Sequence, residues 1–166
     1  LKKNLDSFIK RKKININKFD LITSFAMFYD VDDPNSFCKD ISISLKNNGI
    51  WMLELSYLPL MLKNLTYDQI CHEHVGYYTL TSFKNIIQKY QIKIIDVSFN
   101  EINGGSVEII CAKNNSKFKT NNKKINKVLL EEKKIKDISY KNFNLRINEV
   151  RINLQKFIKL NTRKKI

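Results

Sequence analysis

Hydrophobic positions along the chain fall into two kinds of pattern, continuous short runs and helical spacing. Phe19–Phe25 is a short apolar run, and residues 50–55 form a second one, so both are predicted to be buried strands. Between these runs Phe37, Ile41 and Leu45 recur every four residues. This spacing places the three side chains on one face of a helix.

The ends of this predicted helix carry recognisable signals. Asp33-Pro34 marks its start, because Asp accepts hydrogen bonds from free N–H groups and Pro fits the first turn. Asn47-Asn48-Gly49 is expected to close it through a left-handed cap. The order of strand, helix and strand predicts a parallel βαβ unit with a right-handed crossover, which places the chain in the α/β class.

The middle of the chain continues with a long connection and three further elements. Residues 56–80 are aromatic-rich and irregular, and long ordered connections within a domain are usually functional. Residues 81–90 are predicted to be a helix with Phe83 among the residues on its inner side. Two strands, at residues 92–99 and 106–112, are predicted to follow, joined by a turn around Asn103-Gly104-Gly105.

The pattern becomes helical from Asn121 onward. Apolar residues there alternate steps of four and three, at Phe143, Ile147, Val150, Leu154 and Phe157. Such a narrow seam is suited to packing on another helix or domain. The chain is therefore divided into a basic N-terminal segment (1–18), an α/β region (19–116) and a helical segment (117–166).

Composition adds a core and a strong positive charge. The 166 residues are 43% hydrophobic, which suits one domain with a real core. The net charge is +14, from 30 Lys plus Arg against 16 Asp plus Glu. Lysine is spread along the chain together with Ile and Asn, which favours a general coding bias over a binding surface. A basic nucleic-acid-binding module stays as an alternative, although no finger, RNP or homeodomain pattern is present.

Glycine, cysteine and hydropathy exclude several classes. The glycines are Gly49, Gly76, Gly104 and Gly105, so no G-x-G turn or Walker-type loop exists to cradle a phosphate. The three cysteines are far apart, which predicts no disulfide scaffold and favours a cytoplasmic location. The most apolar stretch, residues 49–62, is short and carries Glu54, so no membrane span is expected.

The richest chemistry lies in residues 67–78. Both histidines of the chain, His72 and His74, flank Glu73 and follow Cys71. These residues include zinc-type donors, but adjacent side chains do not readily point at one ion, and no fourth ligand is evident. A small metal-binding module is therefore the weaker alternative, and a simple surface or core role for the histidines is a further one.

Acid–base catalysis fits this segment better. An imidazole has a reference pKa of about 6.5 and can move a proton near neutral pH, and a neighbouring carboxylate such as Glu73 can orient it. Tyr77 and Tyr78 offer hydroxyl donors for a developing oxyanion. Backbone N–H groups at Gly104 and Gly105 could meet a ligand oxygen, and an ordinary hairpin turn explains these glycines equally well.

Two sets of motifs resemble a known family. The runs 19–24, 27–30, 33–34 and 45–51 resemble the fourth strand, the following helix and the fifth strand of a class I S-adenosylmethionine-dependent methyltransferase. The runs 54–59, 67–74, 77–78 and 103–106 resemble the sugar C-methyltransferases, which act on nucleotide-linked keto-deoxysugars. The resemblance spans residues 19–113. It implies a partial Rossmann-like sheet followed by long C-terminal helices.

The resemblance also implies roles for individual residues. A base removes a proton from the carbon beside the sugar ketone, and the resulting enolate attacks the methyl group of S-adenosylmethionine. His74 matches the base and Glu73 its partner, with His72 in the same motif. The implied substrate-binding residues are Tyr77, Tyr78, Asn103, Gly104 and Gly105. The implied cofactor-binding residues, at the end of the first strand, are Phe25, Ala26 and Met27.

The sequence departs from the family pattern at two positions and lacks some of its parts. Cys71 stands where the family has a tyrosine, and Asn103 where many relatives have a histidine. The resemblance implies that the main cofactor loop and a zinc-binding region lie upstream of Leu1 and a further region beyond Ile166, with no metal site in this chain. The chain is therefore interpreted as an internal fragment. We expect it to self-associate through an exposed sheet edge and its helices.

Overall fold

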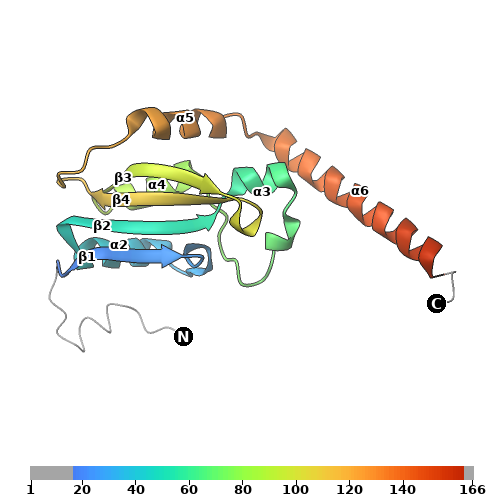
Figure 1. Cartoon of the computed structure of the whole chain (residues 1–166), viewed down its shortest axis with the longest axis horizontal. Helices are drawn as coiled ribbons and strands as arrows, with labels where there is room; N and C mark the ends of the chain where they lie inside the picture. Colours follow the sequence, from blue (N-terminus) through green and yellow to red (C-terminus); the bar gives the residue numbers. More distant parts are fainter. Residues whose placement is uncertain (1–16, 163–166) are drawn as a thin grey trace.

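A four-stranded mixed sheet organises the chain, which a computed structural model describes for residues 17–162 (Figure 1). Its strands are β1 (Phe19–Phe25), β2 (Leu45–Ser56), β3 (Ile92–Asn100) and β4 (Ser106–Lys113), in the order β1-β2-β4-β3. β1 and β2 are parallel, and β4 is antiparallel to both of its neighbours. The parallel pair and the final hairpin are both as the sequence predicted.

Helix α2 (Pro34–Ser44) joins the two parallel strands and begins at the predicted cap. The Asp33 carboxylate accepts hydrogen bonds from the backbone N–H groups of Asn35 and Ser36, each at 3.1 Å. The predicted helix end is wrong, because α2 stops at Ser44 and the following residues enter β2 directly. Gly49 is needed there for close approach, since a Cβ atom would lie 2.8 Å from the carbonyl oxygen of Phe19.

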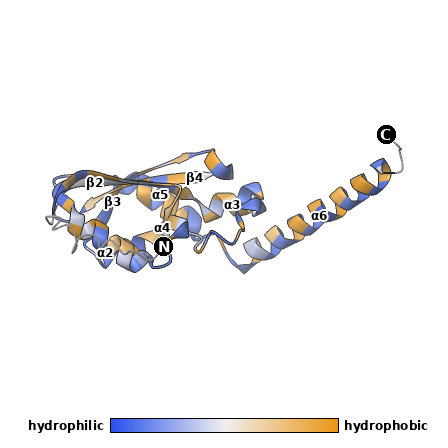
Figure 2. Ribbon diagram, turned by 90° about the horizontal axis from the view of Figure 1, so that it is seen from below, coloured by the Kyte–Doolittle hydropathy of each residue, from blue (hydrophilic) through white to orange (hydrophobic). Residues whose placement is uncertain are grey.

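The hydrophobic core lies between the sheet and the helices α2 and α4 (Leu80–Gln88), which lie on the same face of the sheet (Figures 1 and 2). Trp51 on β2 contacts this layer, with its ring centroid 5.7 Å from that of Phe83 on α4. Phe28 packs on Phe83 from the loop after β1, at 5.2 Å. The predicted helix at residues 81–90 is confirmed, although it begins one residue earlier, at Leu80, and ends two residues earlier, at Gln88.

Strand β1 is far more exposed than its apolar sequence predicted. Of its seven residues only Ser24 is buried, and Leu21 and Phe25 are 55% and 51% exposed. β1 is an edge strand of the described sheet, and α2 and α4 lie on only one of the two faces of that sheet. An apolar run thus formed the expected strand without the expected burial.

The connection between β2 and α4 is more ordered than an irregular loop. It contains helix α3 (Leu58–Asn64) and the single turn η2 (Tyr67–Gln69). Two further single turns, η1 (Phe28–Asp30) and η3 (Ile102–Gly104), follow β1 and β3. All four segments lie near the carboxyl ends of the parallel strands, where α/β proteins place their sites.

Two helices complete the described chain. α5 (Asn122–Glu132) packs beside β3 and α4, and α6 (Asp137–Asn161) extends away from the sheet (Figure 1). Phe143 and Ile147 at the start of the predicted seam pack against α3. The later members Val150, Leu154 and Phe157 are exposed.

The sequence also led to expectations about the cysteines, a membrane span and the N-terminal segment. The three cysteines are free thiols, with Cys38 and Cys111 buried. Among residues 17–162, no helix combines the length and the apolar character needed to cross a membrane. The basic N-terminal segment predicted for residues 1–18 lies almost entirely outside the described part.

Candidate active site

The loop between α3 and α4 is fastened to the ends of β1 and β2. Tyr78 forms a β-bridge with Tyr57, and its carbonyl accepts a hydrogen bond of 3.0 Å from the Leu58 N–H. The Gly76 N–H donates to the carbonyl of Tyr29, also at 3.0 Å. The motif at residues 67–78 is thereby held at the carboxyl end of the parallel strands.

His74 is packed within this loop against an aromatic side chain. Its ring centroid lies 4.3 Å from that of Tyr29, with the two planes inclined at 49°. Tyr77 lies on another side, at 6.4 Å between centroids. The imidazole is partly buried and held in a defined position, as a proton-transfer group requires.

His72 and Glu73 project into solvent instead. Their side chains are 91% and 72% exposed, and His72 Nε2 lies 3.8 Å from Glu73 Oε1. This is a loose surface contact of the kind that contributes little to stability. Among residues 17–162, Glu73 makes no hydrogen bond with His74 in this structure, so the three motif residues do not form one cluster.

Tyr29 is a site residue to which the sequence analysis gave no role. It is 6% exposed, and burial raises the pKa of its hydroxyl, with the charges of Asp30 and Glu54 adding to the effect. Its position directly after the first strand, at the sheet edge where ligands bind, was the available signal. The raised pKa keeps its hydroxyl neutral at physiological pH.

The two tyrosines of the motif occupy different environments. Tyr77 is 37% exposed and its hydroxyl donates a 3.2 Å hydrogen bond to the carbonyl of Gln69. The Gln69 side chain in turn accepts from the Ser56 hydroxyl at the end of β2, at 3.1 Å. Tyr78 is 8% exposed and packs in the core, 5.0 Å from Phe28. Tyr77 is thus the tyrosine placed to meet a ligand.

The glycine turn before β4 packs tightly on the same region. Asn103, Gly104 and Gly105 have φ angles of +53°, +76° and +129°, values that favour glycine. A Cβ atom at Gly104 would lie 2.1 Å from Thr66 Cγ2. The Gly105 N–H already donates to the carbonyl of Ile102 at 3.0 Å. Internal packing and the hairpin therefore account for both glycines.

The residues expected to touch S-adenosylmethionine form an exposed corner at the end of β1. Ala26 has a φ of +50°, and its N–H donates to the carbonyl of Glu54 at 3.1 Å. The turn leaves the Phe25 ring 51% exposed. This apolar corner lies at the carboxyl edge of the sheet, where α/β proteins bind their ligands, so its cofactor role stays a prediction.

The alternative that residues 71–74 bind a metal ion can be examined in the described part of the chain. Within residues 17–162, no group of three or more His, Cys, Asp or Glu side chains is placed to hold an ion. Cys71, His72 and His74, the zinc-type donors of the sequence, are not brought together. The metal-binding alternative thus has no ligand set in this part of the chain.

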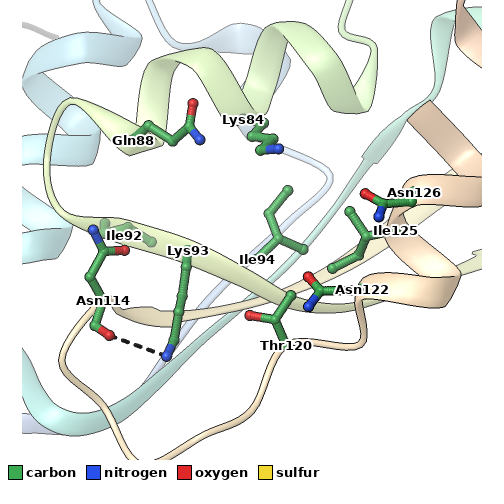
Figure 3. Close-up of a pocket in the computed structure, with 10 residues that line it drawn as sticks. All are labelled: Lys84, Gln88, Ile92, Lys93, Ile94, Asn114, Thr120, Asn122, Ile125 and Asn126. Atoms are coloured by element: carbon green, nitrogen blue, oxygen red, sulfur yellow. Dashed lines mark hydrogen bonds between the residues drawn. The ribbon is translucent and has the colours of Figure 1, made fainter. Parts of the chain in front are cut away.

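A groove of about 340 Å³ lies elsewhere, between α4, β3 and α5 (Figure 3). Lys84, Gln88 and Asn126 are among its lining residues. The ammonium group of Lys93, also on its wall, donates to the carbonyl of Asn114 at 3.2 Å. None of the site residues predicted from sequence lines this groove, so the loop at His74 remains the candidate site.

Comparisons with known proteins point to one family. A family model described as a methyltransferase domain matches residues 3–97. The chain is also similar to the C-methyltransferase NovU of Streptomyces niveus, with 28% identity over 92 residues. That match covers 55% of this chain and 22% of NovU, so the chain spans about a fifth of the curated relative's length.

A solved structure supports the fold. The chain is similar to one chain of the complex between the Haloferax volcanii Trm112 methyltransferase activator and a protein described as a methyltransferase. The TM-score is 0.51 at 11% identity, and the match covers 60% of this chain and 56% of that one. This likeness confirms the α/β, Rossmann-like class expected from the sequence.

Proposed function

Because the chain belongs to the methyltransferase-domain family, we propose that it forms part of an S-adenosylmethionine-dependent C-methyltransferase acting on a nucleotide-linked keto-deoxysugar. In this proposal the glycine-rich cofactor loop, which this chain lacks, is supplied by another part of a longer protein. The name of NovU, a C-methyltransferase, supports transfer to carbon.

One observation carries the proposal. His74 is held against Tyr29, 4.3 Å between ring centroids, at the same edge of the sheet as the exposed Phe25 corner. The proposed base and the proposed cofactor surface are thus both near the carboxyl ends of neighbouring parallel strands. C-methylation requires both, because the carbon must lose a proton before it can accept a methyl group.

The chain's own residues perform the proton step in this proposal. His74 takes the proton from the carbon beside the sugar ketone, and the electron pair of the broken C–H bond moves onto the ketone oxygen as an enolate. The Tyr77 hydroxyl, which donates to the Gln69 carbonyl in this structure, turns its single proton to that oxygen when the substrate binds, and Tyr29 holds the His74 ring in position. When bound, S-adenosylmethionine supplies an electrophilic methyl group to the enolate carbon. Glu73 and His72 lie outside this arrangement.

The proton step can be measured separately from methyl transfer. The full-length gene product is incubated in D₂O with nucleotide-linked keto-deoxysugars and without methyl donor, and NMR follows exchange of the proton beside the ketone. Methyl transfer from labelled S-adenosylmethionine is measured in parallel. His74→Ala is expected to lower both rates by about 10²- to 10⁴-fold, the usual contribution of a general base.

His72→Ala is the matched variant, because it removes the chain's other imidazole from a side chain that is 91% exposed. We expect it to keep most of both rates. Unchanged exchange in the His74 variant would remove that residue from the proton step. Lack of methyl transfer to every keto-deoxysugar by the unmodified protein would refute the proposed substrate class itself.

A further inference from the structure

Two carboxylates stand opposite each other on the open face of the sheet. Glu54 on β2 and Glu108 on β4 are register partners in the antiparallel pair. Glu54 alternates with Leu53 and Leu55, and Glu108 with Val107 and Ile109. These four side chains lie in the core, so both acids point away from α2 and α4. Like charges placed directly across two strands destabilise the sheet unless something compensates them.

Glu108 is a well-satisfied anion. Its carboxylate accepts hydrogen bonds from the Ser98 hydroxyl at 2.8 Å and from the Asn100 side-chain amide at 2.9 Å. The hydrogen bonds from Asn100 and Ser98 lower the pKa of Glu108. This side chain therefore carries a fixed negative charge at neutral pH, and it stands beside Glu54.

Glu54 is the unsatisfied member of the pair. It is only 7% exposed, although it lies on the face that the helices leave open. Its Oε1 atom is inaccessible to solvent and has no hydrogen-bond partner among residues 17–162. A buried carboxylate without a donor is costly, and the opposing charge of Glu108 adds to that cost. A positively charged hydrogen-bond donor would satisfy Glu54 Oε1 and offset the repulsion between the two carboxylates.

Glu54, whose Oε1 atom lacks a hydrogen-bond donor among residues 17–162, is located next to the candidate site. Glu54 pairs with Phe25 in the register of β1 and β2, and its carbonyl accepts from the Ala26 N–H at 3.1 Å. Its charge also contributes to the raised pKa of Tyr29, the ring against which His74 packs. The unpartnered acid is therefore next to the expected cofactor corner in the sheet, and its charge acts on the tyrosine that packs on the proposed base.

Resting on the proposed function, we propose that Glu54 and Glu108 form an acidic subsite that binds a positively charged group of a reactant. Two sources carry this chemistry. One is the sulfonium group of the methyl donor, and the other is an amino group on the sugar. In either case the ligand supplies the cation that the described residues do not place beside Glu54 Oε1.

Binding measurements separate the two sources. Isothermal titration calorimetry on the full-length gene product uses S-adenosylmethionine and S-adenosylhomocysteine, which differ by the sulfonium charge. It also uses two nucleotide-linked keto-sugars that differ only in an amino or a hydroxyl group. Glu54→Gln removes one charge without changing side-chain size. It is expected to weaken the cationic member of one pair about tenfold or more, and the neutral member much less.

Two companion variants make the result interpretable. Glu101→Gln removes a carboxylate that is exposed at the same end of the sheet, and it should leave all four affinities unchanged. Glu108→Gln provides the second test of the subsite should Glu54→Gln fail to fold, as judged by circular dichroism. It should weaken the same cationic ligand as Glu54→Gln.

The outcomes are distinct. Loss of preference for S-adenosylmethionine over S-adenosylhomocysteine assigns the subsite to the methyl donor, and loss of preference for the amino sugar assigns it to the substrate. Equal weakening of charged and neutral ligands, or none, overturns the proposal, and points to a partner side chain from the rest of the protein. Because binding is measured without turnover, absence of methyl transfer would count against the proposed function alone.

Discussion

Glu132, at the end of α5, is a buried carboxylate that ties three segments together. It accepts hydrogen bonds from the hydroxyl of Tyr57 at 2.6 Å and from the N–H and hydroxyl groups of Thr81. It also accepts from the Leu80 N–H, and so caps the N-terminus of α4. Burial and this carboxylate raise the pKa of Tyr57, so the phenol stays a donor. Glu132 thus holds both ends of the connection between β2 and α4, which carries His74.

Replacing Glu132 by Gln is expected to lower the free energy of unfolding by about 2 kcal/mol, because hydrogen bonds to a buried charge are lost and an NH₂ group faces other donors. Urea denaturation of the protein that contains this chain measures the change. Glu131→Gln is the control, since Glu131 is an exposed side chain that pairs with Lys134. That change should cost about 0.5 kcal/mol or less. Equal effects of the two variants would contradict the role given to Glu132.

The three thiols are expected to differ sharply in reactivity. Burial raises the pKa of Cys38 to about 12 and that of Cys111 well above its usual value, so neither forms much thiolate at pH 8. Cys71 lies partly exposed in the loop. Brief alkylation with iodoacetamide at pH 8, followed by peptide mass spectrometry, should modify Cys71 first. Addition of urea should expose the other two thiols, and early labelling of Cys38 in the folded protein would contradict the described core.

At the scale of elements, α6 is anchored to the domain at its beginning only. The Phe143 ring is 5% exposed and packs with Met61 and Leu62 of α3. The Arg146 guanidinium donates to the carbonyls of Leu62 and Lys63, each at 3.2 Å, and so satisfies the end of α3. The first turns of α6 therefore support α3, the helix that precedes the loop carrying His74.

Phe143→Ala is expected to loosen α3 while leaving the sheet intact, because a buried ring contributes about 3 kcal/mol to its local packing. Hydrogen–deuterium exchange should speed up in residues 58–64 and not in β2 or β4. Phe157→Ala removes the same side chain from a position on α6 that is 64% exposed, and it should change neither region. Faster exchange throughout the sheet would show instead that α3 and the sheet unfold together.

Most elements could be predicted from the sequence because their signals are local. Asp33-Pro34 marked the start of α2, and apolar runs marked the strands. The end of α2 could not be predicted, because Asn47-Asn48-Gly49 has the composition of a helix cap but lies in β2, where Gly49 meets the backbone of Phe19. That contact joins residues thirty positions apart. Residue spacing within one segment cannot predict such a long-range contact.

The site was predictable only in part, for a similar reason. The motif at residues 67–78 was found from its composition, yet His74 is packed and His72 is exposed, a difference that alternation along the chain does not reveal. Tyr29 and Glu54 come from other segments of the chain. Tyr29 contacts the motif directly, and Glu54 lies on β2. In the sequence, Glu54 counted against a membrane span and fell within the motif at residues 54–59, but no role followed for it. Its opposition to Glu108 required the register of β2 and β4.

In residues 17–162, helices α2 and α4 cover one face of the sheet and leave the opposite face open (Figure 2). Strand β1 adds an unpaired edge, and Leu21 on it is 55% exposed. An exposed apolar edge strand is a template for association with another chain. The far part of α6 is a second exposed apolar surface, with Leu160 72% exposed.

Residues 17–162 expressed alone are therefore expected to associate in a concentration-dependent way, through β1 rather than through α6. Leu21→Lys should raise the monomer fraction in sedimentation velocity, because a charged side chain on an edge strand opposes pairing. Leu160→Lys places the same charge on the more exposed helical residue and should leave association nearly unchanged. Circular dichroism checks that both variants fold. If Leu160→Lys disperses the oligomer and Leu21→Lys does not, α6 is the associating surface. A monomer at all concentrations would show that neither surface is adhesive by itself.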